Sequence, residues 1–302
     1  MSAGLAEIAA GDLDLDATLG CGQVFHWVRE GAGWLGAVGD APVYLEQNGG
    51  RLLVSAGSAE LAASYLALDH PLAEIRASFP ADPAMMAAAE FCRGLRIVRQ
   101  PAWESVATFI TSAMKQVAHI AQISHTLRRR FGERLEWQGR ELFAYPTPAA
   151  LARLSEAQLR ECALGFRAKN LLGAARMIAE GALDLAAVAR LDDTTARAEL
   201  CRLPGVGEKV ANCALLFGFG RVRAFPIDVW IARVLRELYF KRKRKVTPPR
   251  LREFAATYFG PYGGYAQQYL FHHARKTWPR GRGANRAVRI CTFADREFGD
   301  EG

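Results

Sequence analysis

The chain has 302 residues, of which 39 are Lys or Arg and 31 are Asp or Glu, so its formal net charge is +8 at pH 7. This surplus, with a pI near 9.4, favours a polyanionic partner but equally suits an ordinary basic protein. The first 13 residues lack the basic start and apolar core of a signal peptide, and no apolar run is long enough to cross a bilayer. Secreted and membrane-spanning classes are therefore not expected.

The six cysteines are scattered along the chain rather than paired in sequence. They are Cys21, Cys92, Cys162, Cys201, Cys213 and Cys291. No two of them form a CxxC pair, and no spacing matches a zinc or iron–sulfur framework. We therefore expect reduced, buried thiols in a cytosolic protein and no metal site.

The first third of the chain is predicted to be rich in β-structure. Apolar and polar residues alternate over residues 22–28, as they do in a half-buried strand. Short strands are also expected over residues 33–38, 43–47 and 52–54, because Gly, Asp and Asn turns separate them. These segments predict an antiparallel meander, which a helix over residues 59–67 follows.

From about residue 83 onward the pattern is helical. Apolar residues recur at helical spacing over residues 103–131, and Gly132 predicts a stop. Further helices are expected over residues 147–154, 155–163, 168–180, 183–189, 195–202, 208–217, 229–239, 249–258, 265–275 and 285–298. The basic run at 241–245 can contact phosphates or act as a targeting patch, although such runs are more often solvated loops.

The most informative stretch is the sequence LPGVGEKVA, in which Gly205 and Gly207 bracket Val206. Gly tolerates backbone angles that other residues avoid, so a tight hairpin is expected here. Such a hairpin can aim backbone N–H groups at a phosphate, and Lys209 lies in the first turn of the helix after it. Asp228 follows the lysine by 19 residues. An amine beside a phosphate-binding hairpin, with a carboxylate downstream, suggests chemistry on a nucleic-acid backbone or sugar.

Several motifs together resemble one family of DNA-repair enzymes. The hairpin, its lysine and the sequence FPIDV around Asp228 resemble the helix–hairpin–helix glycosylase superfamily. The stretches GQVFHW at 22–27, LGFRA at 164–168 and GYAQ at 264–267 resemble its 8-oxoguanine DNA glycosylase/AP lyase branch, in matching order and separation. The resemblance covers about residues 11–298. A lone hairpin is moderately specific, because many non-enzymatic DNA-binding proteins carry one, whereas the full set is highly specific.

The resemblance implies that Lys209 is a nucleophile. An amine must lose its proton before it can attack, which desolvation or a neighbouring cation promotes. Attack at C1′ would expel the damaged base, and the resulting Schiff base would permit β-elimination of the 3′ phosphate. Asp228 is a natural N-cap that can also stabilise the positive charge that develops on the sugar. The alternative is that Lys209 is a surface lysine that contacts phosphate.

The resemblance also implies how the flipped base is recognised. The base would lie between Cys213 and Phe271, since sulfur and an aromatic ring both suit an apolar π face. Gln267 would read the Watson–Crick edge, because an amide both donates and accepts. The Gly22 carbonyl would accept a hydrogen bond from the N7–H that oxidised guanine carries and normal guanine lacks. The alternative for Cys213 and Phe271 is core packing, and the alternative for Gly22 is backbone geometry at a strand end.

The sequence departs from the family at positions that would contact DNA. The family's asparagine triplet falls at residues 114–116, where Met114 comes first, and a nearby arginine falls at His119. The tyrosine wedge is Phe166, while the adjacent Arg167 is retained. An apolar Met114 can still fill the gap left by the flipped base, but it cannot make the same hydrogen bonds, so selectivity for cytosine opposite the lesion is in doubt. The family's histidine two residues after the aspartate is Trp230 here, which is expected either to alter phosphate contact and pocket shape or to belong to the core.

The predicted fold class is α+β, with an antiparallel, twisted β domain over residues 1–82 and two mostly helical domains over 83–203 and 204–302, the last carrying the helix–hairpin–helix motif and packing with residues 83–100. The predicted function is excision of 8-oxoguanine from double-stranded DNA by a monomeric glycosylase/AP lyase that needs no metal or cofactor. The expected location is the cytoplasm and nucleoid, or the nucleus in a eukaryote. An alkylpurine glycosylase and a non-catalytic damaged-DNA-binding protein are the alternatives.

Overall fold

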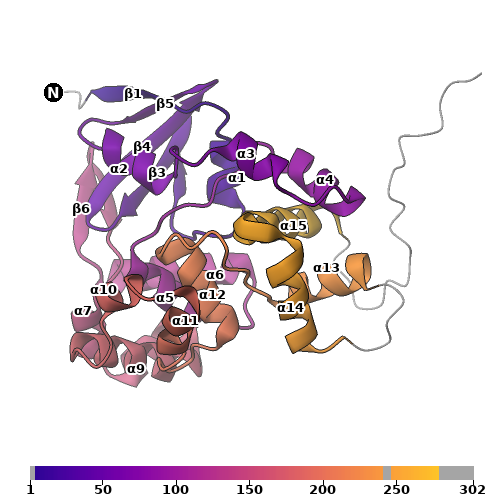
Figure 1. The fold of residues 1–302 in the computed structure, drawn as a ribbon. Helices are drawn as coiled ribbons and strands as arrows, with labels where there is room; N and C mark the ends of the chain where they lie inside the picture. The colour runs from indigo at the N-terminus through magenta and orange to yellow at the C-terminus, as the bar shows by residue number, and fades with distance from the viewer. Residues whose placement is uncertain (1–3, 241–245, 279–302) are drawn as a thin grey trace, which may run out of the picture.

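The computed structural model describes residues 4–240 and 246–278. The basic run at 241–245, Cys291 and the helix expected over 285–298 lie outside these ranges. A β-sheet layer comes first in the chain and helices follow, so the predicted α+β class is confirmed (Figure 1). Among the described residues, no helix has the length and apolar character needed to cross a membrane.

A five-stranded antiparallel sheet forms the N-terminal part, in the order β1-β5-β4-β3-β2 (Figure 1). The strands are β1 (Leu5–Ala9), β2 (Val28–Glu30), β3 (Gly33–Val38), β4 (Ala41–Asn48) and β5 (Arg51–Ser55). Strands β3, β4 and β5 lie where the sequence predicts them, whereas β1 was not expected and pairs with β5 at the edge. Fully buried Leu45 and Leu52, from the central strands, contribute to a small core of the sheet layer.

The strand predicted over residues 22–28 is wrong for residues 22–27, because β2 begins only at Val28. The residues from Gln23 to Trp27 are all buried, so the alternation of apolar and polar residues does not correspond to one buried and one solvent-exposed face. Gln23 is fully buried, and its side-chain amide bonds to three backbone groups in other segments. These side-chain bonds replace the strand partner, and the loop starts at Gly22, whose φ of +93° is incompatible with a strand.

Of the first four helices, two contribute to the core of the sheet layer and the next two to the core of the helical part. They are α1 (Leu15–Gly20), α2 (Ala59–Tyr65), α3 (Leu72–Ala77) and α4 (Pro83–Phe91). The start of α4 is well specified by sequence. Asp82 accepts hydrogen bonds from the amides of Ala84 and Met85, and Pro83 occupies the first helical position.

The helical pattern over residues 103–131 forms two helices, α5 (Ala102–Thr111) and α6 (Val117–Phe131). Between them Met114 has a φ of +55°, a left-handed conformation that a right-handed helix does not contain. The apolar spacing continues across this break, and spacing alone therefore does not reveal it. The break places Met114 at the surface, where its side chain is 91% exposed.

A hairpin of β6 (Arg134–Trp137) and β7 (Arg140–Phe143) follows α6 and was not expected. Gln138 and Gly139 both have positive φ angles, +47° and +76°, as a two-residue hairpin turn requires. Trp137 stacks on Tyr44 of β4, with 4.7 Å between ring centroids and 8° between ring planes. The hairpin thereby joins the helical part to the N-terminal sheet (Figure 1).

The remaining helices agree with the sequence expectation to within a few residues. They are α7 (Pro148–Ala152), α8 (Glu156–Leu159), the π-helical turn η1 (Arg160–Leu164), α9 (Arg167–Ala179), α10 (Leu185–Ala189), α11 (Asp193–Leu200), α12 (Glu208–Gly218), α13 (Val229–Tyr239), α14 (Pro248–Tyr258), the 3₁₀ turn η2 (Gly260–Tyr262) and α15 (Gly263–Thr277). Helix α12 packs on α5, whereas α15 packs against α4 and α13 (Figure 1). The buried apolar residues from α3 to α15 form one continuous core, which runs across residue 203. The domain boundaries at 82/83 and 203/204 therefore stay a prediction.

Candidate active site

The predicted hairpin lies between α11 and α12, and it needs glycine at one of its two glycine positions. Gly205 has a φ of +80°, and an added Cβ would lie 2.7 Å from the Cβ of Asn170. Gly207 is extended and faces open space, so its backbone conformation does not require glycine. Val206 between them is buried. Gly207 is the N-cap of α12 without a side-chain cap, which leaves the first amides of this helix available to an acceptor such as phosphate.

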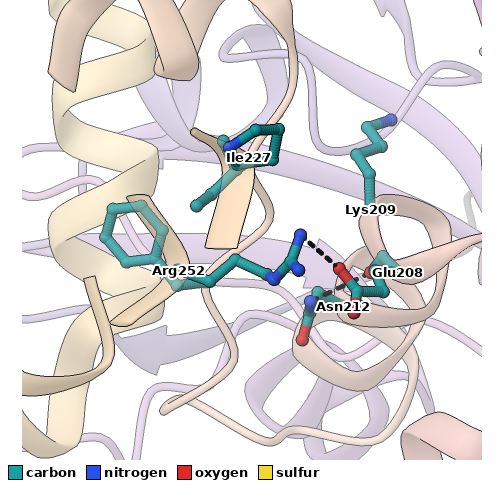
Figure 2. A pocket seen from close by; sticks show the side chains of 7 residues that line it. Glu208, Lys209, Asn212, Ile227 and Arg252 are labelled. Atoms are coloured by element: carbon teal, nitrogen blue, oxygen red, sulfur yellow. Dashed lines mark hydrogen bonds and ion pairs between the residues drawn. The ribbon is translucent and has the colours of Figure 1, made fainter. Parts of the chain in front are cut away.

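Lys209 lies in the first turn of α12 and is half-buried. Its Nζ donates a hydrogen bond to Ser112 Oγ at 3.3 Å and lies 5.1 Å from the centroid of the Phe109 ring. The side chain points away from the ion pair between Arg252 and Glu208, whose N···O distance is 2.7 Å (Figure 2). A cavity of about 70 Å³ lies beside the lysine, but Cys213, Gln267 and Phe271 do not line it. The contacts of the amine are thus with Ser112 and Phe109, at the C-terminal end of α5.

Asp228 is the N-cap of α13, and its Oδ1 accepts a hydrogen bond from the amide of Ile231 at 2.7 Å. Burial raises the pKa of this carboxyl above 3.8, against the opposing effects of its amide hydrogen bonds and of the positive charge on Lys209. The predicted N-cap is therefore confirmed. A half-buried carboxyl with a raised pKa can accept and return a proton more readily near neutral pH.

Cys213 lies one turn after Lys209 on α12 and is 3% exposed. Burial raises the pKa of its thiol to about 11, so the sulfur stays neutral at pH 7. The positive charge of Lys209 lowers this pKa, and the negative charge of Asp228 raises it. Lys209 and Cys213 thus lie on one face of α12, and Asp228 at the N-cap of α13 interacts electrostatically with both.

Gln267 and Phe271 lie one turn apart on α15. Gln267 is only 5% exposed, and its Oε1 has no hydrogen-bond partner among the described residues. A buried amide oxygen without a partner is costly, and such an atom in a native protein calls for an explanation such as an absent ligand. Gly22 lies close to the same helix, since a Cβ added to it would lie 3.6 Å from Phe271 Cε1. The chain thus folds so that the loop before β2 meets α15.

The two predicted wedge residues lie on adjacent loops. Met114 is 91% exposed after α5, and Phe166 is 56% exposed just before α9. Arg167 joins the two loops, because its guanidinium donates to the carbonyls of Ala113 and Leu164 and lies 4.3 Å from the centroid of the Phe166 ring. Arg167 is itself 5% exposed. Arg167 therefore supports the two loops that carry Met114 and Phe166. Its contact with DNA stays a prediction.

Two further predicted DNA contacts occupy different environments. His119 is exposed in the first turn of α6, where its ring is available to a partner. Trp230 is half-buried in the first turn of α13 and packs against the core. The core alternative for Trp230 therefore agrees with its position, and its effect on phosphate contact stays a prediction.

Sequence reasoning missed three residues that contact the site. Phe109 and Ser112 hold the lysine, and Arg275 donates to the carbonyl of Cys21 at 3.0 Å, next to Gly22. A signal for Arg275 exists, because it follows Phe271 by four residues and Gln267 by eight on one helix, and such spacing places all three on one face. In the parts of the chain that the structure describes, no group of three or more His, Cys, Asp or Glu residues could hold a metal ion.

Comparisons with known proteins agree with this geometry. Residues 6–106 match the family model of the 8-oxoguanine DNA glycosylase N-terminal domain, and residues 107–257 match that of the HhH-GPD superfamily base excision DNA repair protein. The chain is 31% identical to the N-glycosylase/DNA lyase OGG1 of Arabidopsis thaliana over 280 residues, which cover 86% of this chain and 77% of the plant protein.

Two more similarities extend this result. The chain is 32% identical to a protein called "Probable N-glycosylase/DNA lyase" in Methanothermobacter thermautotrophicus, with 61% of this chain and 65% of the archaeal protein covered. The structure superposes with a TM-score of 0.85 on the 8-oxoguanine glycosylase/lyase of Clostridium acetobutylicum in complex with double-stranded DNA that contains cytosine opposite 8-oxoguanine. That match covers 90% of this chain and 96% of the clostridial chain at 29% identity. The chain therefore belongs to the HhH-GPD superfamily of base excision DNA repair proteins and, within it, to the 8-oxoguanine DNA glycosylase family.

Proposed function

We propose that this protein is a bifunctional DNA glycosylase/AP lyase that removes 8-oxoguanine from double-stranded DNA and cleaves the resulting abasic site. The observation that carries the proposal is the placement of the Lys209 amine, held by Ser112 in the first turn of α12, and of the half-buried Asp228 carboxyl at the N-cap of α13, with the charge of the lysine acting on that carboxyl. A phosphate-binding hairpin alone would need neither group in this arrangement. The family membership and the names of the relatives support the same activity.

Lys209 is the proposed nucleophile. Once its Nζ has given up a proton, it attacks C1′ of the damaged nucleotide, and the bond from C1′ to the base breaks as the base leaves with the electron pair. The secondary amine that forms opens the sugar ring to a protonated imine. Loss of a proton from C2′ then drives elimination of the 3′ phosphate, and water releases the lysine.

Asp228 is proposed to act on charge and protons in these steps. As the base leaves, positive charge develops on the sugar, and a fixed carboxylate nearby stabilises it. The raised pKa of the carboxyl suits it to accept the lysine proton and to return it later. Its bond to the Ile231 amide holds it in one orientation, so capping the helix and serving the reaction are compatible roles.

The base pocket is proposed to consist of Cys213, Phe271, Gln267 and Gly22. The neutral thiol and the aromatic ring offer soft surfaces for the two faces of the flipped base. The Oε1 of Gln267, which has no hydrogen-bond partner in the described part of the chain, would accept a hydrogen bond from the base edge. The Gly22 carbonyl would accept the N7–H of 8-oxoguanine, whereas normal guanine would present a second acceptor there.

A panel of duplex substrates tests the proposal directly. Duplexes that contain 8-oxoguanine, an alkylated purine or uracil, each opposite all four bases, are incubated with excess protein, and base release and strand cleavage are measured separately. We expect release of 8-oxoguanine with strand cleavage, both lost in Lys209→Ala. Preferred release of the alkylated purine without cleavage would favour an alkylpurine glycosylase. Binding without base release, unchanged in Lys209→Ala, would favour a non-catalytic DNA-binding protein.

The proposed function also indicates where and in what form the protein acts. An enzyme with this substrate acts on DNA, so we place it in the nucleoid, or in the nucleus if the organism is a eukaryote. The monomeric state stays a prediction, which sedimentation of the protein alone and on a single-lesion duplex would test.

A further inference from the structure

The loop that carries Gly22 is held from the last described helix, α15. Arg275 Nη1 donates a hydrogen bond to the carbonyl of Cys21 at 3.0 Å, and Gln268 Nε2 donates to the same oxygen at 3.4 Å. This carbonyl belongs to the peptide bond that links Cys21 to Gly22. Cys21 is completely buried and Gln268 is 2% exposed. The orientation of the peptide that precedes Gly22 is therefore fixed by two side chains from α15.

The opposite side of Gly22 is fixed independently. The carbonyl of Gln23 accepts a hydrogen bond from Gln100 Nε2 at 2.9 Å. The side chain of Gln23 is itself anchored, because its Nε2 donates to the carbonyls of Thr18 at 2.8 Å and Arg96 at 2.7 Å. This half of the loop is held by residues outside α15, whereas Arg275 holds the Cys21 side, so removal of Arg275 would weaken the anchoring of the Cys21 side.

Arg275 also borders the proposed base pocket. Its guanidinium lies 5.2 Å from the centroid of the Phe271 ring, and its Nη1 would lie 2.6 Å from a Cβ added to Gly22. Its positive charge reaches Asp228, where it opposes the effect of burial on the carboxyl pKa. One guanidinium thus lies beside the lesion-reading glycine and the stacking ring, and within electrostatic range of the catalytic carboxyl.

We propose that Arg275 is a positioning residue for lesion recognition, which holds the Cys21–Gly22 peptide so that the Gly22 carbonyl faces a base stacked on Phe271. This inference rests on the proposed function and adds to it a residue that selects the substrate without performing the chemistry. Arginine suits the role because its planar group can donate to a carbonyl within its plane while its face lies over a ring. Lysine offers the charge but not this combination.

The test separates base recognition from the later chemistry. Arg275→Met and Arg275→Lys are assayed with excess protein on two duplexes, one with 8-oxoguanine and one with a preformed abasic site. The abasic site needs Lys209 but has no base to recognise. For Arg275→Met we expect base release to slow at least about tenfold, as for loss of a hydrogen bond from a charged donor. Cleavage of the abasic site should slow by no more than about threefold, and Arg275→Lys should retain part of the base release.

Two further variants serve as controls. Arg93→Met removes an exposed arginine that pairs with Glu90 on the surface, and both activities should stay at the wild-type level. Gln268→Leu removes the longer of the two hydrogen bonds to the Cys21 carbonyl and should slow base release less than Arg275→Met does. If Arg275→Met does not fold, as judged by thermal unfolding, Arg275→Lys and Gln268→Leu carry the test.

Equal losses on both duplexes would overturn the proposal, because Arg275 would then serve the fold or the charge at Asp228 rather than recognition. Unchanged base release in Arg275→Met would overturn it as well. Failure of the wild-type protein itself to release 8-oxoguanine would overturn the proposed function, a result that the wild-type assay reveals before any variant is compared.

Discussion

Asp228 caps α13, and two substitutions separate this structural role from its proposed chemical role. Asp228→Ala removes both the carboxyl group and the cap of α13, whereas Asp228→Asn removes the charge and keeps an oxygen that can accept from the Ile231 amide. Asn is as good an N-cap as Asp, and loss of such a cap costs about 1 kcal/mol. In a chain of this size we expect Asp228→Ala to melt about 1–2 °C below Asp228→Asn.

The charge itself is expected to lower the stability of the wild-type protein. Because burial raises the pKa of Asp228 in the folded state, its ionised form favours the unfolded chain. The stability of the wild-type protein relative to Asp228→Asn should therefore fall as the pH rises above 3.8 and through the folded-state pKa. Below the unfolded pKa both side chains are neutral, and the difference should vanish.

Thermal unfolding over a pH series and single-turnover base release measure these two roles in parallel. Both variants should lose base release by roughly 100-fold or more, as when an electrostatic group is removed from an active site. Equal melting temperatures of the two variants would contradict the capping role. Wild-type activity in Asp228→Asn would contradict the chemical role, whatever the melting temperatures are.

Three more substitutions test separate parts of the account. Gly22→Ala places a Cβ 2.6 Å from Arg275 Nη1 at a φ of +93°, so it should lower the free energy of unfolding by about 1–3 kcal/mol. It should also weaken the preference for 8-oxoguanine over guanine. Unfolding measures the first effect, and binding to matched duplexes measures the second. Gly205→Ala at a φ of +80° should weaken binding to damaged and undamaged duplexes alike, which affinity measurements on both will reveal. A loss of affinity for damaged DNA alone would argue against a phosphate-binding hairpin. Met114→Asn should increase the preference for cytosine opposite the lesion, because an exposed amide can hydrogen-bond to the opposite base and a thioether cannot. Unchanged relative rates of base release over the four opposite bases would contradict this role.

Much of the fold follows from local signals in the sequence. Strands β3 to β5 and the helices from α7 to α15 lie where period and turn residues place them, because each buries one face against a neighbour. The errors occur where tertiary contacts replace local ones. The buried Gln23 side chain bonds the backbone of other segments, and Met114 interrupts a helical pattern that its neighbours continue.

In the candidate site, features set by local structure were predictable from the sequence, whereas contacts between distant segments were not. The spacing of the hairpin, Lys209 and Asp228 predicts the positions of the proposed reacting pair, because both are fixed by local elements, a helix start and an N-cap. Contacts between distant segments were not predictable from one sequence. The donation from Arg275 to the Cys21 carbonyl joins residues 254 positions apart, and the hydrogen bond of Lys209 to Ser112 joins residues 97 apart.

Covalent capture of the protein on damaged DNA tests the central claim most directly. Borohydride reduces an imine between Lys209 and the opened sugar to a stable amine, so the protein and the strand that carried 8-oxoguanine should migrate as one species on a denaturing gel. We predict capture by the wild-type protein and by Arg93→Met, and none by Lys209→Ala. Absence of capture by the wild-type protein under conditions where it releases the base, or full capture by Lys209→Ala, would contradict the account.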